Sequence, residues 1–409
     1  MVEQIAFVLT LSAAVYFIRR RVLRIKSNIQ LGKANHIKDN VSVRLRNMLL
    51  VAFGQKKMFK KWIPAVLHLF IYVGFLVINL EVLEFVIDGL AGTHRIFAPA
   101  LGSFYTVLMN VFELLAVAVL FSCVAFLIRR NVLGIRRFHA RELTGWPRLD
   151  GNLILVIEIM LMFAILSMNA ADQVLQTRSD HYAATGTLFF SSFLVPAFQS
   201  LSTGTLVFIE RFAWWFHIVG ILAFSVYITY SKHLHIFLAF PNTYFARIAP
   251  KGQLHNMPVV TAEVKNMLGL AAAPATTTAE PGRFGAKDVN DLNWNNLLEA
   301  YTCTECGRCT AECPANLTGK KLSPRKIMMD TRDRMEEVGK SIANGGPGLN
   351  DGKTLLNDYI TKEEINACTS CNACVEACPV LINPLDIIVE LRRYIAMEES
   401  GAPPSWNTV

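Results

Sequence analysis

Eight of the nine cysteines fall into two copies of one spaced pattern. Each copy reads C-x2-C-x2-C-x3-C-P, with three cysteines close together and a fourth directly before a proline. The first copy contains Cys303, Cys306, Cys309 and Cys313, and the second contains Cys368, Cys371, Cys374 and Cys378. This spacing is typical of polypeptides that hold two [4Fe–4S] clusters, whose chemistry is electron transfer.

In such paired motifs the fourth cysteine of each copy ligates the cluster of the other copy. We therefore predict that one cluster is held by Cys303, Cys306, Cys309 and Cys378, and the second by Cys368, Cys371, Cys374 and Cys313. Zinc sites and disulfides are the alternatives, but zinc sites usually come as separated C-x2-C pairs and disulfides need no trailing Cys-Pro. The remaining Cys123 lies in an apolar segment and is expected to be a small core residue.

The chain has 409 residues, and its 53% hydrophobic content and mean hydropathy of +0.35 exceed those of an ordinary soluble protein. Apolar stretches run over residues 3–18, 62–87, 104–128, 151–171 and 212–230. Most approach the ~20 residues with which a helix crosses the hydrocarbon core. The first is short, but Arg19, Arg20 and Arg21 follow it, which is not the order of a signal peptide.

The net charge of +8 follows the loops between these stretches. Residues 19–61 carry thirteen Lys or Arg against the single acid Asp39, and residues 129–149 carry six Arg against Glu142. The loops at 88–103 and 173–209 each carry one Arg. This alternation predicts an N-terminus outside and everything after residue 231 in the cytosol of a bacterial cytoplasmic membrane, and it argues against a nucleic-acid-binding protein. The cytosol also keeps cysteines reduced for clusters.

We predict an all-α protein in which a five-helix transmembrane bundle is followed by a cytosolic α-helical two-cluster domain. The expected boundaries are 1–258 for a membrane domain that binds haem b and quinone, 259–287 for an Ala-, Thr- and Pro-rich linker, and 288–409 for the ferredoxin domain.

Histidines in or beside the apolar stretches are candidate haem ligands. His217 and His235 are 18 residues apart, which is five turns at 3.6 residues per turn, so we expect them to share one helix face, whereas His233 faces elsewhere. We place His68 and His235 near the cytosolic edge and predict that they hold one b-type haem. His217 lies near the outer edge, where it could bind a second haem with Met109 or Met168, or bind a quinone; a packed histidine is the alternative for each residue.

The carboxylates of Glu113 and Glu158 lie within apolar stretches. Ionisable groups inside a membrane are often functional, and a quinone takes up protons when it is reduced. Both are therefore candidates for a quinone site, with a hydrogen bond between helices as the equally weighted alternative.

The segments Trp214-Trp215-Phe216-His217 and Lys232-His233-Leu234-His235 resemble the nitrate reductase gamma subunit family, a five-helix dihaem quinone-binding module. In that family the second helix carries two ligands ten residues apart, whereas here Ile78 follows His68 at that spacing. The cysteine region resembles the α-helical ferredoxin of heterodisulfide reductases. Both resemblances imply a membrane-bound iron–sulfur oxidoreductase that links a cytosolic donor, such as electron-transferring flavoprotein, to quinone.

Relatives of this kind often carry a Cys-Cys-Gly catalytic domain. We find no such motif here and expect that function in a separate subunit, or a flavoprotein partner. The sequence predicts an electron-transfer subunit of a quinone-linked oxidoreductase complex with two [4Fe–4S] clusters, haem b and a quinone site. A membrane-anchored ferredoxin that acts as a docking or redox-sensing module without haem is the alternative. The basic residues Lys320, Lys321, Arg325 and Lys326 are a candidate docking surface or a solvated helix face.

Overall fold

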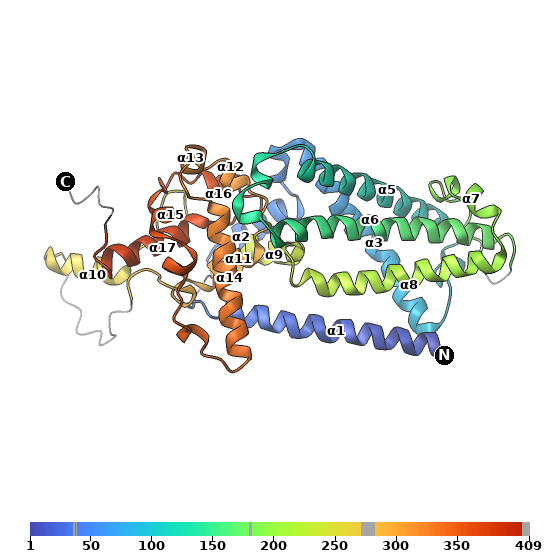
Figure 1. Cartoon of the computed structure of the whole chain (residues 1–409), viewed down its shortest axis with the longest axis horizontal. Coiled ribbons are helices and arrows are strands. Elements are labelled where there is room, and N and C mark those ends of the chain that lie inside the picture. Colours follow the sequence, from blue (N-terminus) through green and yellow to red (C-terminus); the bar gives the residue numbers. More distant parts are fainter. Residues whose placement is uncertain (36, 38, 180–181, 271–282, 403–409) are drawn as a thin grey trace. The chain divides into compact units, whose positions relative to one another are not determined.

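The structure is a computed structural model that describes residues 1–409 except 36, 38, 180–181, 271–282 and 403–409. The predicted all-α class is confirmed: the chain is 71% helical, and the described residues form no strand. Five helices are long and apolar enough to cross a membrane. Four of them include a predicted apolar stretch, and the fifth, Thr203–Ile228, covers all but the last two residues of the stretch 212–230 (Figure 1).

The chain divides into two compact units, each built from two segments. The first unit, here called the bundle, comprises Met1–Val22 and Met58–His233. The second, here called the cluster unit, comprises Leu23–Lys57 and Leu234–Val409. Residues 23–57 and 234–258, which we had expected in the membrane domain, thus belong to the same compact unit as the cysteines.

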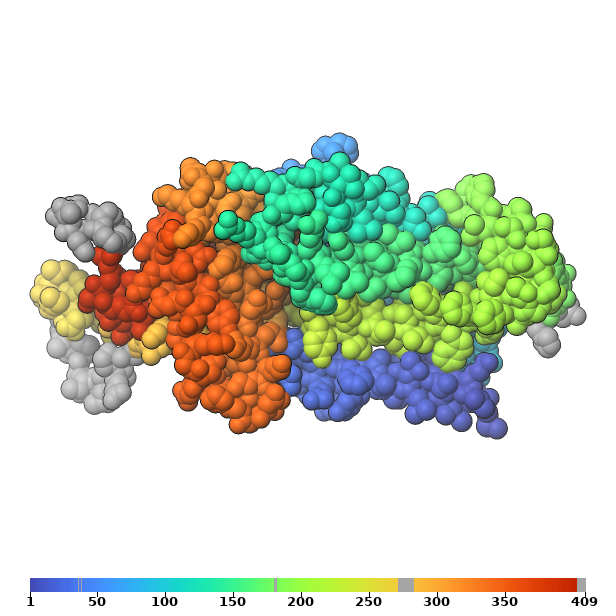
Figure 2. Space-filling view, in the orientation of Figure 1, coloured from blue at the N-terminus to red at the C-terminus, as the bar shows by residue number. Residues whose placement is uncertain are grey.

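Long apolar helices form the bundle, and short helices connect them. These are the first part of α1 (Val2–Ile29), α3 (Trp62–Ala91), α4 (Ala98–Leu101), α5 (Ser103–Asn131), α6 (Trp146–Leu175), α7 (Val195–Gln199) and α8 (Thr203–Ile228). Phe85, Leu161 and Trp214 meet in the buried core. Gly74 and Gly220 allow close packing, because an added Cβ would come within 2.5 Å of Val119 and 2.7 Å of Leu161. Large apolar side chains such as Phe121 of α5, Phe163 of α6 and Phe208 of α8 are exposed, as expected for surfaces that face lipid. Figure 2 shows the surface of these helices in green and yellow-green.

Helix α8 ends at Ile228, although the apolar pattern continues to residue 230. Asp150 of α6 explains this end, because its carboxylate accepts hydrogen bonds from Ser231 Oγ at 2.6 Å and from the backbone N–H of Lys232 at 3.2 Å. A new helix, α9, begins at His235. His217 and His235 therefore lie on two different helices, and the prediction that they share one helix face is wrong.

The cluster unit consists of shorter helices. They are α2 (Val41–Asn47), α9 (His235–Phe245), α10 (Pro258–Met267), α11 (Trp294–Thr302), α12 (Arg308–Ala311), α13 (Pro314–Leu317), α14 (Pro324–Ala343), α15 (Lys362–Asn366), α16 (Ala373–Ala377) and α17 (Pro384–Met397). A π-helical turn, Met48–Phe53, follows α2. Part of the expected linker, 271–282, lies outside the described residues, whereas Ala286 is buried and donates its N–H to Glu390 O at 2.9 Å.

The segment after α1 pairs directly with the approach to the first cysteine motif. The N–H of Lys33 donates to Leu292 O at 2.7 Å, and Trp294 N–H donates to Lys33 O at 3.1 Å. Asn28 Nδ2 also donates to Tyr301 Oη at 2.7 Å. These bonds fix α11, whose C-terminus leads into Cys303.

Gly32 tests this pairing, since an alanine Cβ would lie 2.7 Å from the backbone nitrogen of Trp294, which has no flexible atom to move aside. We expect Gly32→Ala to destabilise the cluster unit by about 1–3 kcal/mol, the usual cost of overpacking. Thermal unfolding followed by circular dichroism would measure it. Gly204→Ala is the control, because its added Cβ meets nothing within 4 Å; equal midpoints for the two variants would contradict the pairing.

Candidate redox sites

Cys303, Cys306, Cys309 and Cys378 line one cavity. Its free space is about 380 Å³, including the opening to solvent. Cys303 follows the C-terminus of α11, Cys309 lies on α12, and Cys378 follows α16 directly before Pro379. Three thiols of the first motif and the last thiol of the second are thus brought together.

Cys313, Cys368, Cys371 and Cys374 line a second cavity, whose free space is about 310 Å³ including the opening to solvent. Cys313 stands directly before Pro314 at the start of α13, and Cys374 lies on α16. Leu322, Leu385 and Ile388 close its apolar side. The grouping of the eight cysteines is the one that the exchanged-ligand pattern predicts, and each cavity offers the four thiols that a [4Fe–4S] cluster requires.

The two motifs also share a backbone conformation. Two residues after the first cysteine, Glu305 and Ser370 each have φ near +55°, and four residues after it Gly307 and Asn372 have φ of +70° and +61°. Glycine and asparagine are the residues that adopt this left-handed region most readily. In the second motif this turn directs the N–H of Ser370 to Cys368 Sγ at 3.4 Å. After that motif, Ile382 N donates to Cys378 Sγ at 3.3 Å.

Burial sets the chemistry of these thiols. It raises the pKa of Cys303 to about 11 and the pKa values of Cys374 and Cys378 to about 12. Iron binds the thiolate, so ligation must release protons that the buried thiols otherwise retain. Among the described residues no three His, Cys, Asp or Glu side chains converge closely enough for a single metal ion.

The basic residues Lys320, Lys321, Arg325 and Lys326 do not form one exposed surface. Arg325 is completely buried and lines the first cavity, and Lys326 pairs with Asp330 at 2.5 Å and Glu364 at 3.0 Å. Lys321 pairs with Glu363 at 2.6 Å. Arg325 therefore belongs neither to a docking surface nor to a solvated helix face, whereas Lys321 and Lys326 keep exposed surface and form ion pairs within the cluster unit.

The candidate haem ligands occupy separate parts of the chain. His68 is half-buried on α3 of the bundle, whereas His235 begins α9 of the cluster unit. His233 lies in the turn between α8 and α9, with its ring 5.6 Å from that of Phe224. Pairing of His68 with His235 remains a prediction.

His217 is almost completely buried, with 1% of its surface exposed. Its Nδ1 lies 3.0 Å from Leu161 O, and its ring contacts Phe85 at 5.6 Å. Its Nε2 has no hydrogen-bond partner among the described residues. A bond from Nδ1–H to a carbonyl leaves Nε2 as the acceptor nitrogen, which is the arrangement of an imidazole ready to bind a metal or a ligand hydroxyl.

Glu113 is surrounded by donors. Its carboxylate accepts from Phe190 N at 2.9 Å, Ser191 N at 3.1 Å and Asn169 Nδ2 at 3.1 Å, and also from Ser191 Oγ. These bonds tie α5 to α6 and to the loop before α7, which favours the packing alternative. Glu158 is half-buried on α6, and the expected core position of Cys123 is confirmed by its complete burial.

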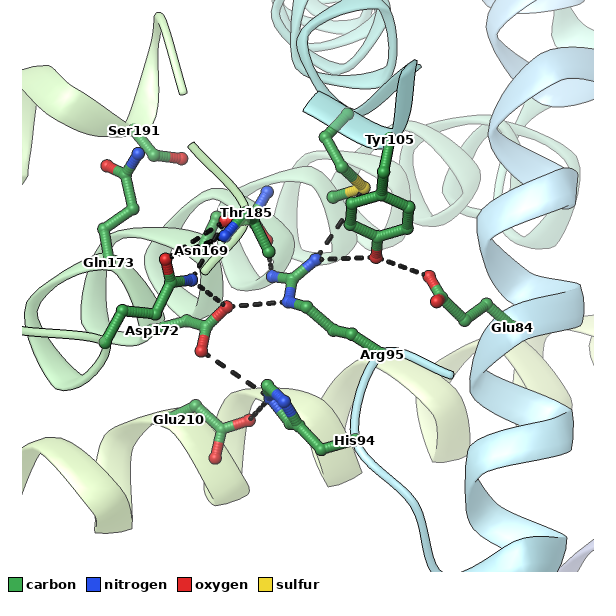
Figure 3. A network of polar contacts seen from close by, with 12 residues as sticks. Glu84, His94, Arg95, Tyr105, Asn169, Asp172, Gln173, Thr185, Ser191 and Glu210 are labelled. Carbon is green, nitrogen blue, oxygen red and sulfur yellow. Dashed lines mark hydrogen bonds and ion pairs between the residues drawn. The ribbon is translucent and has the colours of Figure 1, made fainter. Parts of the chain in front are cut away.

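Sequence reasoning missed a buried polar network in the bundle, drawn in Figure 3. Arg95 lies at its centre: its Nε donates to Asp172 at 2.7 Å, and its two Nη groups donate to Tyr105 at 3.2 Å and to Asn169 at 2.8 Å. Tyr105 in turn donates to Glu84 at 2.7 Å. The signal in the sequence was the spacing of acids at 81, 84 and 88, which places three carboxyls on one face of an apolar helix.

Comparison with known proteins agrees with the cysteine chemistry. Residues 302–382 match the family described as 4Fe-4S dicluster domain. This stretch contains both cysteine motifs.

Over most of its length the chain is similar to iron–sulfur oxidoreductases. It is 28% identical to the "Probable iron-sulfur-binding oxidoreductase FadF" of Bacillus subtilis (strain 168), across 94% of this chain and 54% of that protein. It is 27% identical to the "EtfAB:quinone oxidoreductase" of Syntrophomonas wolfei, across 90% of this chain and 51% of that protein. The chain thus spans about half the length of these two relatives.

A "Probable membrane-anchored ferredoxin" of Chromohalobacter salexigens is 36% identical across 29% of this chain and 20% of that protein. No solved structure matches the chain. A 4Fe-4S domain together with five apolar helices supports a role in electron transfer at a membrane.

The exchanged fourth cysteine gives a specific expectation for mutagenesis. Because Cys313 lines the cavity of the second motif, Cys313→Ser should damage the cluster held by Cys368, Cys371 and Cys374 and leave the other cluster largely intact. Electron paramagnetic resonance of the reduced protein would show which signal is lost. Cys123→Ser is the control and should retain both signals; selective loss of the first motif's signal in Cys313→Ser would contradict the exchange.

Proposed function

We propose that this chain carries electrons between a soluble redox protein and the membrane quinone pool through two [4Fe–4S] clusters and haem b. The observation that carries the proposal is the convergence of the cysteines as two sets of four, each combining both motifs. Two adjacent clusters form a relay that moves one electron at a time. The five apolar helices provide the membrane part that would receive electrons from such a relay.

Haem b is proposed at His68 and His235, because two imidazoles are a ligand set that b-type haem accepts. The haem would supply a one-electron carrier between the clusters and the bundle. His217 is instead assigned to the quinone, since its free Nε2 can accept a hydrogen bond from a quinol hydroxyl. Ile78, a buried apolar residue, stands where a second histidine of α3 would be needed.

For the topology we propose the N-terminus outside and the cluster unit in the cytosol of a bacterial cytoplasmic membrane. The basic loops 19–61 and 129–149 support this orientation. The soluble partner is proposed to be a flavoprotein or a subunit with a Cys-Cys-Gly domain. The name of the Syntrophomonas relative supports an electron-transferring flavoprotein as the class of this soluble partner.

A second candidate is a membrane-anchored ferredoxin that docks or senses redox partners without haem. The similarity to the protein of that name from Chromohalobacter favours it, but the matched part covers only 29% of this chain. The buried polar groups of the bundle support electron and proton chemistry over a simple anchor, since a mere anchor needs no intramembrane carboxyls.

The haem assignment predicts that His68→Ala and His235→Ala abolish the same haem b band in the reduced-minus-oxidised optical spectrum. Each of these two variants lacks one axial ligand of the same haem iron, so both variants should give the same spectrum. His217→Ala should retain the band, and so should His233→Ala. Loss of the band in His233→Ala alone would show that the other histidine of the pair is the ligand.

The relay also predicts that the purified chain oxidises a quinol analogue only when an artificial redox dye accepts electrons from the clusters. Clusters and haem store single electrons and need an external partner. A steady-state assay with and without the dye would measure this. Turnover of a natural soluble substrate by the purified chain alone would contradict the subunit role.

A further inference from the structure

Three acidic residues lie along the buried face of α3. Glu81, Glu84 and Asp88 are 3%, 4% and 5% exposed, in a helix that is otherwise almost entirely apolar. Spacings of three and four residues place them on one side of the helix. Carboxyl groups in a membrane-spanning helix are costly and need a compensating interaction or a function.

Glu84 and Asp88 have structural partners. Glu84 accepts from Tyr105 Oη at 2.7 Å and from Phe97 N at 3.0 Å. Asp88 accepts from Arg95 N at 2.8 Å and Thr93 Oγ1 at 2.6 Å, and so shapes the loop after α3. These two carboxylates hold the loop that carries Arg95 against the end of the bundle.

Glu81 differs from its neighbours. Its Oε1 is buried and has no hydrogen-bond partner in the part of the chain that the structure describes. The charged groups that face it are Arg95, Glu84 and Glu113, and Arg95 is already engaged by Asp172, Asn169 and Tyr105. A buried carboxylate without a partner costs several kcal/mol, so Glu81 is expected to retain its proton at rest.

Glu81 lies one helical turn from a residue that contacts His217. Phe85, one turn further along α3, contacts the rings of His217 at 5.6 Å and Trp214 at 6.0 Å. Four long helices joined in sequence alternate in direction, so α3 and α8 are antiparallel. Glu81 precedes Phe85 by one turn of α3. Because α8 runs the opposite way, the part of α8 beside Glu81 lies on the His217 side of Trp214. A carboxylic acid that can release a proton and an imidazole nitrogen that can accept a hydrogen bond thus border the same part of the core.

We propose that Glu81 is the proton-exchanging residue of the membrane quinone site, with the quinone head group bound between Glu81 and His217. This assignment rests on the proposed quinone function. Reduction of a quinone takes up two electrons and two protons to give a quinol. For each electron that arrives, the O–H bond of the Glu81 acid breaks and its proton forms an O–H bond on a quinone oxygen. Water at the end of the bundle then supplies the next proton.

The network in Figure 3 supports both halves of this cycle. Arg95 cannot lose its proton, and it serves as a fixed positive charge that stabilises the transient Glu81 carboxylate. His94, with 22% of its side chain exposed, lies 3.6 Å from Asp172 and 3.8 Å from Glu210. Burial lowers the pKa of His94, which favours the neutral form of this partly exposed imidazole.

The test uses the full chain with its clusters and haem reduced by dithionite and then mixed with a water-soluble quinone analogue. Glu81→Gln keeps the size and polarity of the side chain but cannot donate a carboxylic proton. General acid catalysis contributes about 10²–10⁴-fold, so we expect reoxidation to slow about 100-fold or more. Glu81→Asp should recover part of the rate. Glu263→Gln, an exposed change of the same kind on α10, is the control.

A second readout does not depend on turnover. The redox-difference infrared spectrum of the wild type should contain a protonated-carboxyl band that Glu81→Gln removes, while reduction of the clusters by dithionite stays unchanged. Wild-type rate and an unchanged band in Glu81→Gln would overturn the assignment of Glu81 and leave the quinone function standing. A wild-type protein that no quinone reoxidises would overturn both.

Discussion

The requirement that each cluster take its fourth thiolate from the other motif constrains the whole cluster unit. Cys313 and Cys378 can exchange partners only if two loops separated by 54 residues lie face to face. Helix α14 and its buried arginines make this possible. Arg334 is fully buried and is held by Asp288 at 2.7 Å and Asp351 at 2.6 Å, which joins the segment before α11 to the segment before α15. Removing one member of such a buried pair typically costs about 3–5 kcal/mol.

A different constraint governs the bundle, where lipid offers no water to buried polar groups. The structure concentrates its buried acids where α3 and α6 end and α5 and α8 begin, around Arg95. Most acids there are bound by N–H groups, by hydroxyls or by Arg95, and they hold loops against helix ends. Glu81 and His217, like His94 and Asp172 of the network, each retain a buried atom without a hydrogen-bond partner among the described residues, and such exceptions call for a functional explanation.

Local spacing predicted much of this protein. The five apolar helices and the grouping of the cysteines follow from patterns that depend on near neighbours in the sequence. The structure departs from expectation where tertiary contacts decide the outcome. Asp150 ends α8 at Ile228, and burial removes Arg325 from the surface. Residues 23–57 join the cluster unit through backbone bonds that no periodicity reveals. The acids of α3 were visible in the sequence, but the partners of Glu84 and Asp88 come from α5 and from the segment between α3 and α5.

Quantitative Mössbauer spectroscopy of the purified, iron-57-enriched chain tests the central claim most directly, because it counts each class of iron. The account predicts about eight cluster irons per chain, in two [4Fe–4S] sites of four, together with low-spin haem iron held by two histidines. Only four cluster irons per chain, or zinc in place of cluster iron, would contradict the two-cluster relay. Cluster iron without haem iron would leave a ferredoxin domain but contradict the electron path into the bundle.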